Sequence, residues 1–117
     1  MKALVAVAGL VCLLAITGCS SNSKAASKDI TITACTASRT GGHPKASGTI
    51  HNHSGKSSVY TIHVKFKDSS GNSVGDGFTA VAKVDPGTAA KWDLTGDFNA
   101  KGPLKCSLDS ATRNAAP

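Results

Sequence analysis

The chain has 117 residues, with thirteen Lys or Arg, seven Asp and no Glu, so its formal net charge is +6. This positive charge does not indicate a nucleic-acid-binding protein, because the sequence has neither an Arg-rich run nor basic residues interleaved with aromatic ones. Because the chain has no Glu, paired-carboxylate catalysis would need two Asp residues. The Asp residues are spread over predicted turns, where Asp usually bonds to the backbone, so this chemistry is not indicated.

The N-terminus has the order of a secretory signal peptide, expected over residues 1–18. A positively charged start precedes an apolar run over residues 3–15, which is shorter than the roughly 20 residues of a membrane-spanning helix. The following Ile-Thr-Gly-Cys19 sequence resembles the lipobox of bacterial lipoproteins. That resemblance implies that Cys19 carries diacylglycerol and anchors the chain on the extracytoplasmic face of the cell membrane. A plain signal peptide with a coincidental cysteine is the alternative.

The mature chain is expected to be one small domain on a tether. Residues 19–28 are small and polar and predict a flexible linker. The foldable unit is expected over residues 29–113, and residues 114–117 form a tail with nothing to anchor them. Loss of Lys2 with the signal peptide leaves twelve Lys and Arg against seven Asp, a net charge of +5. This charge favours loose contact with an anionic bilayer or wall polymer, although a solvated surface is the simpler interpretation.

Cysteine usage predicts one disulfide. Cys12 leaves with the signal peptide and Cys19 carries the lipid, so Cys35 and Cys106 remain as a pair. In an exported protein such a pair is expected to be oxidised, and in the chain-entropy model a loop of this length contributes about 4 kcal/mol. The alternative is a pair of thiols in a metal or redox site, but the two cysteines lack Cys-x-x-Cys spacing.

From residue 29 onward the apolar residues alternate with period two, and no window shows a helical stripe. The expected strands cover residues 29–36, 45–52, 58–67, 73–84, 89–95 and 104–108. In the first strand, Ile30 and Ile32 share one face and Cys35 falls on the other, so we expect either a bulge before Cys35 or a strand that ends there. The segment over 73–84 is expected as one strand or two short ones.

The second and third strands are predicted to pair as a hairpin, because a short Ser-Gly-Lys connection joins them. In that arrangement Ile50 faces Ile62 or Val64 in the core. The third strand has the strongest alternation, and its predicted inward residues are Tyr60, Ile62, Val64 and Phe66.

The later segments predict further core residues and one exposed aromatic. Residues 73–84 have an apolar set that is expected to point inward together: Val74, Phe78, Ala80, Ala82 and Val84. Asp-Pro86-Gly87-Thr predicts a type II turn. Trp92 alternates with charged neighbours and is assigned to the core, whereas Phe98 lies in a glycine-flanked loop and is expected to be exposed.

Six or seven short strands at this spacing predict an all-β fold, a two-sheet antiparallel sandwich with the disulfide joining its first and last strands. The runs over 48–54, 60–68 and 84–87 resemble small Ig-like domains of exported bacterial proteins, including the FxLYD domains. A cysteine pair joining the first and last strands is also typical of short actinobacterial lipoproteins with such a domain. The resemblance covers about residues 30–113 and implies an Ig-like β-sandwich with no catalytic residues.

Three histidines raise the question of a metal site. His51 and His53 lie two residues apart on one predicted strand, and the predicted hairpin places His63 on the same polar face. Three converging imidazoles are ligands that Cu²⁺ or Zn²⁺ favours. Lys65 and Lys67 on that face would repel a cation, so a solvated polar face is the preferred interpretation, with no metal and no cofactor.

An enzyme is not expected, because the sequence contains no Gly-x-Ser-x-Gly elbow or comparable nucleophile motif. The leading hypothesis is a membrane-anchored, non-catalytic accessory or binding module that meets an envelope protein or an anionic wall polymer. Candidate contacts are Lys65, Lys67 and Phe98. A Cu- or Zn-binding envelope protein that uses the histidine cluster is the alternative, and a structural spacer without a ligand is a third possibility.

Overall fold

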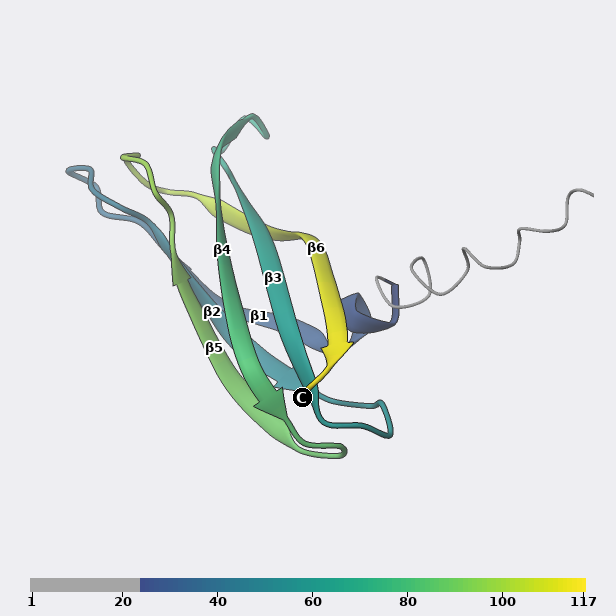
Figure 1. Ribbon diagram of the computed structural model, residues 1–117. Coiled ribbons are helices and arrows are strands. Elements are labelled where there is room, and N and C mark those ends of the chain that lie inside the picture. The colour runs from purple at the N-terminus through teal and green to yellow at the C-terminus, as the bar shows by residue number, and fades with distance from the viewer. Residues whose placement is uncertain (1–23) are drawn as a thin grey trace, which may run out of the picture.

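The computed structural model describes residues 24–117, so the predicted signal peptide and the predicted lipidation site at Cys19 lie outside the described residues. Six strands form two three-stranded antiparallel sheets that pack against each other (Figure 1). The strands are β1 (Ile30–Thr36), β2 (Lys45–His51), β3 (Ser58–Lys67), β4 (Ser73–Val84), β5 (Ala89–Thr95) and β6 (Lys105–Ala115). One sheet has the order β1-β2-β5 and the other β4-β3-β6. The predicted all-β sandwich is therefore confirmed.

The core lies between the sheets and is built mainly from β2, β3 and β5. Along β3, every second side chain is fully buried, as the alternation of the sequence predicts: Tyr60, Ile62, Val64 and Phe66. Trp92 and Leu94 of β5 are also buried, and the Trp92 indole N–H donates to the Thr49 carbonyl at 3.2 Å. This bond satisfies the one polar group of the Trp92 ring, so the ring packs in the core as expected.

The disulfide joins the two sheets at one edge of the sandwich. Cys35 in β1 and Cys106 in β6 are bonded, with 5.7 Å between their Cα atoms. The register of β1 against β2 shifts between Ile32 and Ala34, so of the two expected alternatives the bulge is the one that forms. Because one extra residue reverses the alternation of the strand, Cys35 points inward together with Ile30 and Ile32, where it reaches β6.

The predicted hairpin of β2 with β3 is wrong. β2 pairs with β1 and β5, whereas β3 pairs with β4 and β6, so residues 52–57 carry the chain from one sheet to the other. A fully buried Asn52 makes this corner: its amide donates to the carbonyls of Lys56 and Val84, at 2.9 and 2.8 Å. Its side-chain oxygen accepts from the backbone N–H and the hydroxyl of Ser54. Ile50 and Ile62 thus share the core from opposite sheets.

The inward face of β4 also differs from the prediction. Gly75 and Gly77 pair with the buried positions of β3 and point inward. A Cβ atom on Gly75 would lie 2.6 Å from the Phe98 ring, and one on Gly77 would lie 2.8 Å from a methyl carbon of Leu94. Phe98 and Leu94 therefore occupy the space that inward side chains of β4 would need. The apolar residues that this arrangement turns outward are Val74, Phe78, Ala80 and Ala82.

Of the predicted β4 set, only Val84 is buried. The register of β3 against β4 shifts between the Ser58 and Tyr60 pairs, and Lys83 has a φ of 55° next to Val84. This irregularity turns Val84 to the inside at the end of the strand. The turn that follows agrees with the prediction, because Gly87 has a φ of 73° and the Thr88 N–H donates to the Asp85 carbonyl.

The ordered domain extends beyond its predicted limits at both ends. Residues 24–28, assigned to the tether, form a short helical turn in which Ala26 is fully buried against the core. At the other end, β6 continues to Ala115, and the Ala116 N–H donates to the Ser57 carbonyl at 2.8 Å. The expectation of an unanchored tail over 114–117 is therefore wrong. No helix within residues 24–117 is long and apolar enough to cross a membrane.

Candidate functional site

The strongest candidate site lies on the outer face of the β4-β3-β6 sheet. β3 is the central strand of this sheet, and its outward residues alternate with the buried ones. We call this surface the His63 face and define it by five side chains: His63, Lys65, Asp76, Phe78 and Asp109. Three different strands contribute to it, so the site depends on the pairing of the strands rather than on one stretch of sequence.

His63 at the centre of this face lies between two carboxylates. Its Nε2 atom is 2.8 Å from Asp76 Oδ2, and its Nδ1 atom is 2.9 Å from Asp109 Oδ2. The His63 side chain is only 17% exposed, whereas half of the Asp76 side chain and a third of the Asp109 side chain are accessible. The Nε2 contact with Asp76 has the geometry of a hydrogen bond, whereas the Nδ1 contact with Asp109 is a close approach of ion-pair type. In this arrangement a carboxylate lies next to each ring nitrogen of His63.

A bulge in β6 delivers the second carboxylate. The register of β3 against β6 shifts between His63 and Val64, whose partners are Ser110 and Leu108, so Asp109 is the extra residue. A bulge changes the direction of a side chain relative to the regular strand. Asp109 thereby reaches both His63 and the Lys65 ammonium, the latter at 3.3 Å.

Phe78 supplies the apolar part of the His63 face. It is the cross-strand partner of His63, and the two rings stack with centroids 4.0 Å apart and planes at 8°. Phe78 is nevertheless 62% exposed, more than any other large apolar side chain in residues 24–117. The stacking therefore fixes the orientation of an exposed aromatic ring, and exposed aromatic rings are the side chains that most often act as anchors in protein interfaces.

The other sequence-predicted contacts are distributed differently. Phe98 is half-buried rather than exposed, because its ring packs edge-on against Phe66 with centroids 5.4 Å apart. Lys65 belongs to the His63 face, and Lys67 follows on the same side with Lys105 of β6 as its cross-strand partner. The exposed aromatic of this domain is thus Phe78, and the sequence-based assignment exchanged the roles of the two phenylalanines.

The structure does not bring the three histidines together. His51 and His53 lie at the end of the β1-β2-β5 sheet, with ring centroids 4.2 Å apart, whereas His63 lies on the outer face of the other sheet. The expected convergence depended on the hairpin of β2 with β3, which does not form. Within residues 24–117 no group of three or more His, Cys, Asp or Glu side chains is arranged to hold a metal ion.

His53 belongs instead to a polar cluster around the buried Asp29, whose side chain is 2% exposed, while the His53 side chain itself is 62% exposed. Asp29 accepts hydrogen bonds from the Tyr60 hydroxyl, from His53 Nδ1 at 2.7 Å and from Arg113 at 2.9 Å. Burial alone would raise the pKa of Asp29, but these donors more than offset it and hold the pKa below its usual value. Burial and the hydrogen bond to Asp29 raise the pKa of Tyr60 to about 12. The cluster links the start of β1 to β3 and β6.

Sequence reasoning missed Asp76 and Asp109, and it preferred Phe98 to Phe78 as the exposed aromatic. Asp76 had a recognisable signal, because it alternates with Val74 and Phe78 and must share their face. Asp109 had no such signal, because the direction of its side chain depends on a bulge that the β6 sequence does not predict. Comparison of the chain with protein-family models, with curated proteins and with solved structures gives no match.

Proposed function

We propose that this chain is a lipid-anchored protein of the extracytoplasmic membrane face, and that its β-sandwich is a non-catalytic module that binds an envelope protein or wall polymer. The His63 face is the observation that carries this proposal. It combines an exposed aromatic ring with charged groups that are already paired, so little side-chain entropy is lost on binding. Exposed aromatics surrounded by polar groups are typical of the centres of protein-binding surfaces.

Two features support the location. The Ile-Thr-Gly-Cys19 sequence is the expected lipidation signal, and the disulfide is favoured in an oxidising compartment outside the cytoplasm. Membership among the small Ig-like domains of exported bacterial proteins is part of the same proposal. It is supported by the six-stranded sandwich and by the disulfide between the first and last strands.

The geometry of His63 supports a role without catalysis. A histidine that acts as general base needs one unprotonated nitrogen within reach of the nucleophile or a water. Here both nitrogens contact carboxylates, and the Phe78 ring covers one face of the imidazole. These contacts hold the ring in one orientation and make it part of a rigid surface.

The anchor is tested by the mass of the membrane-extracted protein. A diacylglycerol-modified N-terminal peptide that begins at Cys19, and its loss in the C19S variant, are expected. An unmodified Cys19 would contradict the lipid anchor but would leave the binding module open to test.

The binding role is tested with the mature C19S chain, which is residues 19–117 with Cys19→Ser. This chain is immobilised and crosslinked to wall and membrane fractions, beside the variants F78A and K91A. Lys91 lies on the exposed side of β5 in the other sheet and is the control. Capture of one defined partner by the parent chain and by K91A, with at least a tenfold loss in F78A, is expected. Equal capture by both variants would contradict binding through the His63 face.

A further inference from the structure

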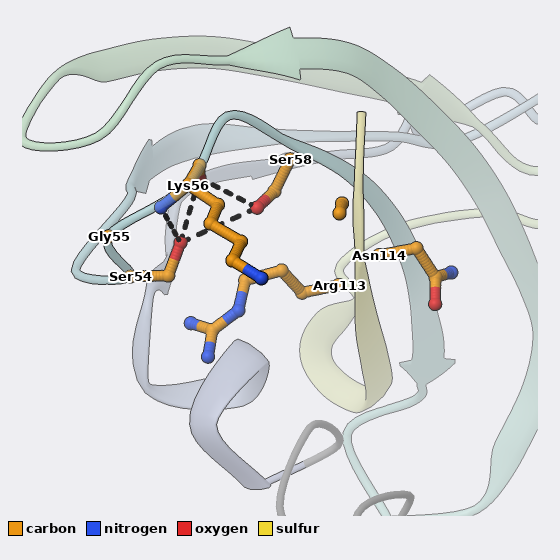
Figure 2. Close-up of a pocket in the computed structure, with 7 residues that line it drawn as sticks. Ser54, Gly55, Lys56, Ser58, Arg113 and Asn114 are labelled. Carbon is orange, nitrogen blue, oxygen red and sulfur yellow. Dashed lines mark hydrogen bonds between the residues drawn. The ribbon is translucent and has the colours of Figure 1, made fainter. Parts of the chain in front are cut away.

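A polar cleft lies between the corner over residues 52–57 and the end of β6, away from the His63 face. Its lining residues are Ser54, Gly55, Lys56, Ser58, Arg113, Asn114 and Ala115. Figure 2 shows the side chains of Lys56 and Arg113 extending into this cleft, with the hydroxyls of Ser54 and Ser58 at its wall. Two cationic side chains that share one cleft indicate a ligand with negative charge.

Both cations have donors available. The hydrogen bonds of Lys56 all involve its backbone N–H or carbonyl, and its ammonium has no ion-pair partner within the described residues 24–117. Arg113 uses its Nη1 to contact Asp29, but a guanidinium carries five N–H donors. Arg presents a planar fork and Lys a point charge, which is the combination that proteins use for phosphate groups.

The cleft is ordered before any ligand arrives. Asn52 fixes the corner through its two donated bonds to carbonyl oxygens, one of them that of Lys56. The buried Asp29 carboxylate fixes Arg113 from beneath, and only 16% of the Arg113 side chain is exposed. Asp29 also cancels one of the two positive charges in part. The exposed ammonium of Lys56 is therefore the group whose charge is most available to a ligand.

The position of the cleft indicates where its ligand comes from. Asp29, which holds Arg113, directly follows the helical turn over residues 24–28, and this turn adds Lys24 and Lys28 to the same end of the domain. Only four residues lie between Cys19 and position 24, and the five steps of chain that join them span at most about 18 Å. A lipid on Cys19 would therefore hold this end of the sandwich beside the bilayer surface. Each Lys or Arg that lies near the surface of an anionic bilayer raises the membrane-binding constant about fivefold.

We propose that this cleft binds the phosphate group of an anionic phospholipid headgroup, an assignment of the ligand source that rests on the proposed anchor at Cys19. The Lys56 ammonium and the free N–H groups of Arg113 contact the phosphate oxygens. The anchored domain then has a defined orientation on the membrane, with the corner over residues 52–57 turned toward the lipid.

The test uses the mature C19S chain, so that no lipid of its own contributes to membrane binding. Its partition onto vesicles is measured by sedimentation, with phosphatidylcholine alone and with phosphatidylcholine mixed with phosphatidylglycerol. The variant K56Q removes the free cation and keeps the backbone contacts of the loop. The matched control is K101Q, because Lys101 is exposed in the loop between β5 and β6, where the neighbouring Ala100 bonds to Gly42. Thermal melts check that both variants are folded.

We expect the parent chain and K101Q to bind the anionic vesicles more tightly than the neutral ones, and K56Q to lose about fivefold. Equal losses in both variants would show diffuse charge attraction and would overturn the cleft as a site. No preference for anionic vesicles would overturn it as well. Inorganic phosphate is then added as a competitor. If it displaces the chain from the vesicles and binds the cleft as tightly as the lipid headgroup does, the site takes free phosphate and the lipid assignment is wrong. These results do not depend on whether Cys19 is lipidated in the cell or on the partner of the His63 face.

Discussion

The corner at Asn52 makes the sharpest prediction about stability. Asn52 is fully buried where the chain passes from one sheet to the other, and its side chain takes part in four hydrogen bonds. The variant N52A removes all four. The Lys56 carbonyl keeps the Ser58 hydroxyl as a donor and gains the Ser54 hydroxyl, whose one proton no longer bonds to Asn52, whereas the Val84 carbonyl loses a buried partner.

The expected cost follows from these contacts. A typical hydrogen bond contributes about 1 kcal/mol net, and a buried carbonyl without its donor costs a further 1 to 3 kcal/mol, approximately. Because the Lys56 carbonyl is compensated, we expect N52A to lower the free energy of unfolding by about 3 to 5 kcal/mol. For a domain of this size, such a loss lowers Tm by roughly 15 °C or more.

Urea unfolding of the mature C19S chain, followed by Trp92 fluorescence, measures this loss. The control is N72A, because Asn72 is exposed in the turn after β3 and its hydrogen bonds to Asp68 use only its backbone. An exposed substitution of this kind changes stability by about 0.5 kcal/mol or less. If N52A loses less than about 1 kcal/mol, or no more than N72A, the buried amide does not hold the corner and the reasoning is refuted.

Three further outcomes test the buried interactions. Tyr60 is the only tyrosine of the chain, so the tyrosinate absorbance of the native protein should titrate near pH 12, against about 10 after unfolding. Because the pKa of Tyr60 is higher in the folded state, its contribution to stability is complete below the unfolded pKa and is lost as pH rises through the folded pKa. A titration midpoint near pH 10 in the native protein would contradict the hydrogen bond to Asp29. The lowered pKa of Asp29 has the opposite consequence: its contribution is complete above its unfolded pKa of about 3.9 and is lost as pH falls through the folded value. The variant D29N should therefore weaken the acid dependence of the urea midpoint, and parallel profiles for the two chains would argue against this role. Reduction of the disulfide, which closes a separation of 71 residues, should lower the free energy of unfolding by about 4 kcal/mol, and an unchanged urea midpoint would contradict the link between the sheets.

The alternation of apolar and polar residues was sufficient to predict the strands and, for several of them, which face is buried. The range of β3 agrees with the prediction, and its four apolar residues are all buried. The reason is local, because successive side chains of any strand point to opposite sides and one apolar set must face the core. The bulge before Cys35 could be expected for the same reason, because an extra residue in the strand turns the cysteine to the same side as the two isoleucines.

The direction of β4 needed information from elsewhere in the chain. By local pattern, Val74 and Phe78 outweigh the glycines and should face inward. Phe98 and Leu94 instead fill the space above Gly75 and Gly77. Which set is buried depends on the volume that the opposite sheet and the following loop already occupy, and no short window of sequence contains that volume.

The sequence alone determined that this chain is a β-sandwich with one disulfide, because side-chain alternation, turn chemistry and cysteine count are local or compositional properties. Only the tertiary structure decided which side chains the candidate site brings together. The pairing of strands separated His51 from His63, and it placed His63 between Asp76 and Asp109. A buried Asn52 sends β3 to the second sheet, and a bulge in β6 aims Asp109. The strand pairing, the corner and the bulge all depend on hydrogen bonds between residues distant in sequence. The alternation within one segment therefore predicts a strand but does not determine which strand pairs with it.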